Sequence, residues 1–159
     1  MNKKIKQAIF LFFFIAIPLM AGYWGSQLSG NSTVQTYSQL YRPDFFPPAW
    51  VFAPVWTILY ILMGTSAYLI WKLRKSEDVK FPLTLFLVQL ALNLLWSPIF
   101  FGLHQYLWAL VEIVLLLIMI ILTVLSFGKK SKVAAYLLIP YLFWVSFATI
   151  LNYVVFMTN

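Results

Sequence analysis

The stretch of residues 43–64 carries the densest set of side chains that could bind or react with a ligand. It begins as a loop, because two consecutive prolines hold the residues before them out of the α region. It continues as an apolar helix that contains Pro54 and the rings of Trp50, Trp56 and Tyr60. A proline inside a membrane helix frees backbone carbonyls, which a neighbour must satisfy. Rings beside such a break are typical of a pocket wall, and the alternative is an ordinary membrane helix with interfacial aromatic residues.

Two other apolar segments place amide groups beside aromatic rings. Polar groups at membrane depth need partners, so Asn152 is expected to point into a helix bundle, where it either bonds a neighbouring helix or contacts a ligand. Gln89 and Asn93 either satisfy the carbonyls freed by Pro54 or meet a ligand. At helical spacing these amides share faces with the following residues: Trp96, Ser97 and Phe100 in one segment, and Pro140, Tyr141, Trp144, Phe147, Ala148 and Leu151 in the other.

Few titratable side chains accompany these rings. Glu112 lies one turn from Trp108 near a helix start, where it is either solvated at the interface or a functional carboxylate. His104 lies in a short turn and either ligates a haem iron or is solvated. Arg42 and Asp44 lie together in a loop, where they either pair with each other, contact the mouth of the bundle, or meet a ligand's carboxylate.

The composition identifies an integral membrane protein. The 159 residues are 63% hydrophobic and only 9% charged, whereas soluble domains carry about 25% charged residues. The net charge of +7 resides in short tracts between apolar runs, which indicates membrane topology and contact with anionic lipid, and no nucleic-acid partner. The chain has no cysteine and one histidine, which excludes disulfides, thiolate metal sites and His-rich metal sites.

The apolar runs predict an all-α fold, an integral membrane bundle of five transmembrane helices in one domain that spans residues 1–159. The helices are expected at about 7–28, 48–71, 82–101, 106–127 and 133–157, each close to the length that crosses a bilayer. The first could instead be a cleaved signal peptide. The polar segment of about 29–46 is expected to be a loop, either an outward lid or a solvated connector.

Charge asymmetry predicts the orientation of the chain in the cell membrane. Ten of the eleven Lys and Arg residues flank one side of the five spans, and only Arg42 lies opposite. Such a bias places the N-terminus in the cytoplasm and the C-terminus outside. The segment of about 29–46 then faces outward.

The same residues exclude several classes of enzyme. One histidine in a turn cannot complete a Ser–His–Asp set, and the chain has no Gly-rich phosphate loop. The remaining possibility is a tryptophan-rich, sparsely polar cavity. Such a cavity suits a flat hydrophobic ligand held by stacking and by a few amide contacts.

Four motifs together resemble the TspO/MBR family of bacterial tryptophan-rich sensory proteins and mitochondrial translocator proteins, also called peripheral benzodiazepine receptors. The resemblance covers essentially the whole chain in the right order. The motifs are Pro47-Pro48-x-Trp50-x-Phe52-x-Pro54-Val55-Trp56-x-x-Leu59-Tyr60-x-x-Met63-Gly64, Asn93-x-x-Trp96-Ser97-Pro98-x-Phe100-Phe101, Trp108-Ala109-Leu110, and Pro140-Tyr141-x-x-Trp144-x-x-Phe147-Ala148-x-x-Leu151-Asn152.

The resemblance implies a five-helix bundle, commonly a homodimer, that binds porphyrins such as protoporphyrin IX and haem. It also implies binding of isoquinoline-carboxamide and benzodiazepine drugs, with no required cofactor. The implied pocket lies between the helices under the first loop. By motif position its lining comprises Gly22, Trp50, Phe52, Ala53, Trp56, Asn93, Trp96, Trp108, Leu115, Trp144, Phe147, Ala148 and Leu151.

Some bacterial members of this family are reported to degrade porphyrin in light, which would make the protein a photo-oxidative enzyme without a conventional catalytic site. The candidates for that chemistry are Trp50, Trp56 and Trp144, whose indoles an excited porphyrin or singlet oxygen would oxidise. The alternatives are a transporter of tetrapyrroles or other hydrophobic ligands, and a non-catalytic stress regulator that acts through a partner protein. The basic residue of the animal sterol pattern is missing after Tyr153, which argues against cholesterol binding.

Overall fold

The structure is a computed structural model that describes residues 2–30 and 32–159. Those residues contain only helices and connecting turns, and five of the helical segments are long and apolar enough to cross a membrane. The predicted all-α bundle of five transmembrane helices is therefore confirmed. The five segments are Lys3–Leu28, Ala49–Lys75, Lys80–Gly102, Tyr106–Gly128 and Lys132–Thr158.

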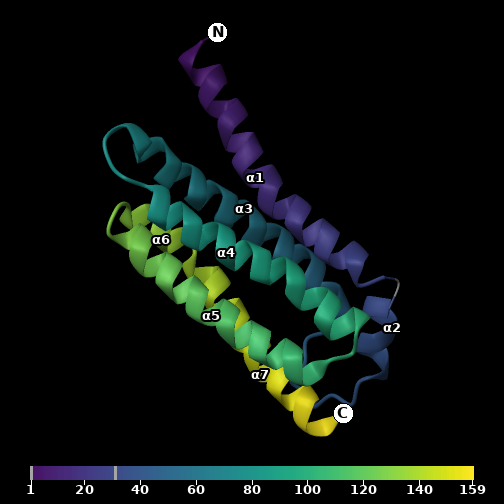
Figure 1. Ribbon diagram of the computed structural model, residues 1–159. Coiled ribbons are helices and arrows are strands. Elements are labelled where there is room, and N and C mark those ends of the chain that lie inside the picture. The colour runs from purple at the N-terminus through teal and green to yellow at the C-terminus, as the bar shows by residue number, and fades with distance from the viewer. Residues whose placement is uncertain (1, 31) are drawn as a thin grey trace.

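Seven α-helices and three short irregular turns build these segments in the described part of the chain (Figure 1). The turns η1 and η2 are 3₁₀-helical, and η3 is π-helical. The α-helices are α1 (Lys3–Leu28), α2 (Ser32–Gln39), α3 (Phe52–Lys72), α4 (Lys80–Ser97), α5 (Tyr106–Gly128), α6 (Lys132–Leu137) and α7 (Ile139–Thr158), and the turns are η1 (Ala49–Val51), η2 (Leu73–Lys75) and η3 (Pro98–Gly102).

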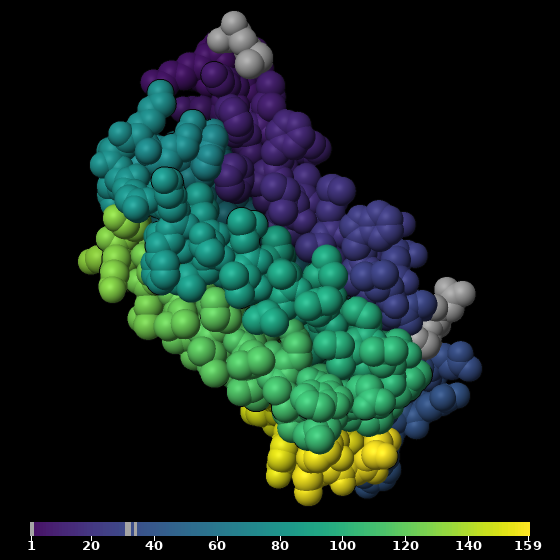
Figure 2. All heavy atoms as spheres, viewed as in Figure 1, coloured from purple at the N-terminus to yellow at the C-terminus, as the bar shows by residue number. Residues whose placement is uncertain are grey.

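The long helices pack as a closed ring in the order α1, α3, α6–α7, α5 and α4. Helix α1 packs along both α3 and α4, and α5 packs along both α4 and α7. The ring is closed mainly by α6 against α3, whereas α7 touches α3 only lightly. The first turns of α1 extend beyond the other helices (Figures 1 and 2). This arrangement therefore leaves a loosely packed seam between α3 and α7.

Two prolines act differently from expectation. Pro54 lies in the first turn of α3, where backbone N–H groups have no intrahelical acceptor, so it does not free carbonyls in mid-helix as predicted. Pro140 interrupts the fifth span, because its ring cannot continue the hydrogen-bond ladder. The helix predicted as continuous over 133–157 is therefore two helices, α6 and α7, that meet at Leu138.

Glycines allow the closest helix contacts. A Cβ on Gly64 would collide with the backbone of Phe14 and Ile15 in α1. A Cβ on Gly22 would collide with the ring of Tyr60, and one on Gly25 would lie 3.0 Å from the carbonyl oxygen of Leu94. The small residues of α1 thus let it approach α3 and α4, as small residues do in membrane helix pairs.

The polar segment 29–46 contains a helix, α2, within the loop expected there. Tyr37 Oη donates a hydrogen bond to the Pro47 carbonyl, and its ring stacks under the Arg42 guanidinium at 4.4 Å. The Asn159 side chain accepts a hydrogen bond of 2.9 Å from Tyr41 N and donates one of 3.3 Å to Tyr41 O. These contacts fix the segment over one end of the bundle, which we call the α2 end.

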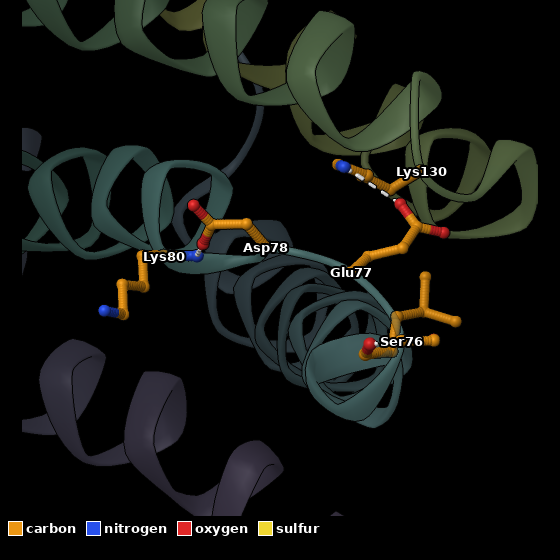
Figure 3. A network of polar contacts seen from close by, with 6 residues as sticks. Ser76, Glu77, Asp78, Lys80 and Lys130 are labelled. Atoms are coloured by element: carbon orange, nitrogen blue, oxygen red, sulfur yellow. Dashed lines mark hydrogen bonds and ion pairs between the residues drawn. The ribbon is translucent and has the colours of Figure 1, made fainter.

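Polar contacts also join the turns at the opposite end (Figure 3). Lys130 Nζ, between α5 and α6, lies 2.9 Å from Glu77 Oε2, between α3 and α4. Asp78 Oδ1 accepts a hydrogen bond from Lys80 N at 3.0 Å, at the start of α4. Both partners of the ion pair are partly exposed, so the pair links the two turns but contributes little free energy of folding.

Candidate functional site

A chain of hydrogen bonds crosses the interior from α3 through α4 to α7. Tyr60 Oη donates to Asn93 Oδ1 at 2.8 Å, and Asn93 Nδ2 donates to Tyr141 Oη at 3.1 Å. Tyr141 Oη donates in turn to Gln89 Oε1 at 2.8 Å. All four residues are buried. The two amides of α4 therefore bond tyrosines and not the carbonyls near Pro54, and the alternative of a ligand contact stays a prediction.

Asn152 makes the interhelical contacts that were one of its two expected roles. Its Oδ1 accepts a hydrogen bond of 3.0 Å from Trp96 Nε1, and its Nδ2 donates one of 3.2 Å to the Tyr106 carbonyl. The Trp96 ring stacks on Phe100 at a centroid distance of 5.0 Å. The face that combines an amide with aromatic rings therefore ties α7 to α4 and to the start of α5.

Aromatic rings line the α3 side of this interior. Trp56 stacks on Tyr60 with ring centroids 5.4 Å apart, and meets the edge of Tyr141 at 6.2 Å. Phe52, one turn earlier, meets Trp144 of α7 edge-on at 5.8 Å. Rings of α3 and α7 thus meet at two places, Trp56 with Tyr141 and Phe52 with Trp144. We call these two groups of rings together the aromatic cluster.

A groove of about 380 Å³ lies along the seam between α3 and α7. Its exposed rim includes Ile58 and Phe143, so it opens sideways to the surface that faces lipid. The Trp144 Nε1 atom is buried and has no hydrogen-bond acceptor. The groove, which we call the α3/α7 groove, is lined by Val55, Ile58, Leu59, Pro140, Phe143, Trp144 and Phe147.

The model of the TspO/MBR family matches residues 14–157. The chain belongs to the TspO/MBR family. It is 44% identical over 155 residues to the tryptophan-rich protein TspO of Chlorobaculum tepidum, which covers 97% of this chain and 98% of that protein. It is 40% identical to the translocator protein of Bos taurus, over 92% of this chain and 88% of that protein, and 36% identical to the tryptophan-rich sensory protein of Cereibacter sphaeroides, over 74% and 72%.

The structure of this TspO/MBR protein brings part of the expected pocket lining together. Phe52, Trp144 and Phe147 form one run of ring contacts, and Trp56 contacts Tyr141 in the interior. Four further expected residues lie close to this cluster or within the bundle interior. These are Asn93, Trp96, Ala148 and Leu151.

Other expected lining residues lie elsewhere. The side chain of Trp50 is 75% exposed in η1, and Ala53 is exposed at the start of α3. Gly22 faces the Tyr60 ring rather than an open space. Trp108 and Leu115 face away from the α3/α7 groove on α5, where they line a separate groove. Of the three tryptophans considered for photochemistry, Trp56 and Trp144 thus share one aromatic cluster and Trp50 is separate from it.

Several residues at the α3/α7 groove were not among the expected pocket residues. Ile58 and Phe143 line the groove, whereas Tyr60 and Tyr141, which the sequence had already marked, contact Trp56 behind it. Helical spacing offered a signal, since 55, 58 and 59 on one helix and 140, 143, 144 and 147 on the other each share a face. The signal was incomplete, because spacing alone does not say that these two faces meet.

His104 and Glu112 are two further candidate residues, and both lie outside the α3/α7 groove. His104 Nε2 lies 3.0 Å from Thr36 Oγ1, which links the turn after η3 to α2. Glu112 is only 7% exposed, so of its two expected settings the solvated one does not apply. Neither residue lines the α3/α7 groove.

Proposed function

We propose that this TspO/MBR protein is a membrane receptor for flat hydrophobic ligands of the porphyrin class, held in the α3/α7 groove. The observation that carries the proposal is that Trp144, which lines this groove among apolar side chains, has a buried indole N–H without a partner. A ligand carboxylate or amide carbonyl would satisfy that donor, while its ring system packs on Phe147 and Phe143. The groove volume lies within the range of small-molecule sites.

The geometry of the seam supports entry from the bilayer. Porphyrins and drug-like ligands such as isoquinoline carboxamides and benzodiazepines partition into lipid, and the groove opens sideways toward lipid. Helix α2 covers the end of the bundle: Thr36 in α2 bonds His104, and Tyr41 just after α2 bonds Asn159, so the open route is the lateral one. We place the N-terminus in the cytoplasm, because the basic residues gather at the end of the bundle opposite α2.

Titration of the purified protein with protoporphyrin IX, read by quenching of tryptophan fluorescence, tests this proposal. The Trp144→Phe variant keeps an aromatic ring but loses the N–H, and we expect its affinity to fall by about 3- to 10-fold. The matched control is Trp50→Phe, which changes an exposed indole outside the groove and is expected to leave affinity unchanged. Equal affinities of the two variants would refute the proposed site.

Light-dependent breakdown of the bound porphyrin is a second part of the proposal. Excited porphyrin transfers energy to dioxygen, and the resulting singlet oxygen is the oxidant for both indole and macrocycle. Trp144 and Trp56 are the candidate indoles because they lie in the aromatic cluster beside the groove. We expect the Soret absorbance to decay under light in air but not in darkness, and to decay more slowly in Trp144→Phe. Decay at the same rate with an unrelated membrane protein would contradict this part.

A further inference from the structure

A second groove, of about 440 Å³, lies where η3 meets the start of α5. Its wall is apolar except for Gln105 at the rim and Glu112 in the wall. Trp108 and Leu115 are 63% and 50% exposed beside it, so the groove opens toward lipid. We call it the α5 groove; its lining residues are Ile99, Leu103, Gln105, Trp108, Val111, Glu112 and Leu115.

Glu112 is the unusual member of this wall. The side chain is 93% buried, and neither carboxyl oxygen has a hydrogen-bond partner. A buried carboxylate without a partner is costly, and carboxyl groups at membrane depth normally pair with a cation or a donor. The chain's single ion pair among the described residues lies at the opposite end of the bundle, between Lys130 and Glu77. Nothing in the α5 groove itself supplies a positive charge.

Trp108 adds a second preference for a cation. It precedes Glu112 by four residues on α5, so both side chains lie on one face of the helix. An indole face attracts an ammonium group, and the attraction grows where water is excluded. The remaining wall, with Leu115, Val111 and Leu103, suits an alkyl chain or an apolar ring.

We propose that the α5 groove binds a cationic amphiphile, a primary ammonium group carried on an apolar body. The ammonium enters between Trp108 and Glu112 and donates to the carboxylate, while the apolar body lies along Leu115 and Ile99. Glu112 lies about 9 Å along α5 from its first residue, by the rise per residue of an α-helix. A charged head group at the membrane interface can reach that depth. This ligand class is opposite in charge to a porphyrin carboxylate, and the site is separate from the α3/α7 groove.

The test uses the full-length protein in phosphatidylcholine nanodiscs and a long-chain primary amine with a spin label on its chain. The readout is quenching of tryptophan fluorescence by the spin label. The part of the quenching that is present in the wild type and absent in Trp108→Phe reports on Trp108. We expect saturable quenching by the amine, and at least about tenfold weaker quenching by the alcohol of the same chain and label, because a charge-assisted bond is lost. Equal quenching by amine and alcohol would overturn the proposal.

Variants identify the carboxylate. Glu112→Gln keeps the side-chain shape. It is expected to weaken binding of the amine by at least about tenfold and to have little effect on binding of the alcohol. Glu77→Gln is the matched control, since it removes a carboxylate at the opposite end of the bundle. It is expected to leave the affinities for both ligands unchanged. Thermal unfolding of both variants verifies that they remain folded. Unchanged amine affinity in folded Glu112→Gln would refute the role of Glu112.

Two further arms separate the sources of the ammonium group and the two grooves. Replacing part of the phosphatidylcholine by phosphatidylethanolamine displaces the labelled amine if a lipid head group occupies the groove, and leaves it bound if a free amine is the ligand; either result supports an ammonium site. Trp144→Phe is expected to leave amine binding unchanged, so failure of this proposal is distinguishable from failure of porphyrin binding. Loss of amine binding in Trp144→Phe would contradict a separate site.

Discussion

At the scale of single residues, the interior of this protein depends on a few polar side chains that satisfy one another. Tyr141 is fully buried and both donates and accepts, so it links Gln89 to Asn93. The donor Gln89 Nε2 is left without a protein partner. The polar chain thus fixes the relative positions of α3, α4 and α7, and with them the inner wall of the aromatic cluster.

Removing the Tyr141 hydroxyl tests that role. Tyr141→Phe leaves the Gln89 acceptor and the Asn93 donor unpaired in the interior, so we expect the free energy of unfolding to fall by about 1 to 2 kcal/mol. Thermal unfolding in detergent or nanodiscs measures the change. Tyr136→Phe is the matched control, because the Tyr136 ring is 68% exposed. Equal stability of Tyr141→Phe and the wild type would show that the polar chain contributes nothing to folding.

At the scale of elements, backbone approach between helices sets the width of the bundle. Gly64 of α3 lies directly against the backbone of α1 at Phe14 and Ile15. In lipid, helices associate through close packing rather than through burial from water, so such contacts matter more than the apolar character of the faces. The break at Pro140 instead accompanies a loose contact. Helix α6 packs on α3, whereas α7, after the break, contacts α3 only lightly.

A methyl group on Gly64 should therefore separate α1 from α3. We expect Gly64→Ala to lower the free energy of unfolding by about 1 to 3 kcal/mol, because the colliding atoms belong to the backbone and cannot rotate away. Gly128→Ala is the matched control, since its nearest atom lies at 3.6 Å, an ordinary contact distance. Thermal unfolding of the two variants side by side measures the difference. A Gly64→Ala variant as stable as Gly128→Ala would contradict the close approach.

At the scale of the whole molecule, charge distinguishes the two ends of the bundle. Lysines and Arg74 surround the turns around Glu77 and Lys130, whereas Arg42 is the only Lys or Arg in the sequence between Lys6 and Lys72 and lies near α2. The Arg42 guanidinium stacks on Tyr37, so that charge is held against the protein. From this asymmetry we expect an orientation in which the α2 end faces outward.

Single-cysteine labelling measures this orientation without background, because the chain has no cysteine of its own. In intact cells we expect a membrane-impermeant maleimide to label Ser38→Cys at the α2 end and not Ser76→Cys at the opposite end. Both positions are exposed in the structure, so after permeabilisation both should react. Labelling of Ser76→Cys alone in intact cells would contradict this orientation and indicate the opposite one.

The sequence by itself determined the architecture. Long apolar runs separated by charged turns require membrane helices, because in lipid each backbone polar group must be satisfied within the segment. The motifs around Trp56, Trp96 and Trp144 also sufficed to indicate the TspO/MBR family, which the family match confirms.

Only the tertiary structure decided which of the marked residues meet. Helical spacing fixes the face on which a side chain lies but not the helix that the face contacts. Because the chain is apolar almost throughout, hydrophobicity does not distinguish a buried face from one that faces lipid. Trp50 and Trp144 look equivalent as sequence, yet one is exposed and the other lines a groove. The separation of Trp108 and Glu112 from the α3/α7 groove likewise depends on the order of helices around the ring, which no local pattern encodes.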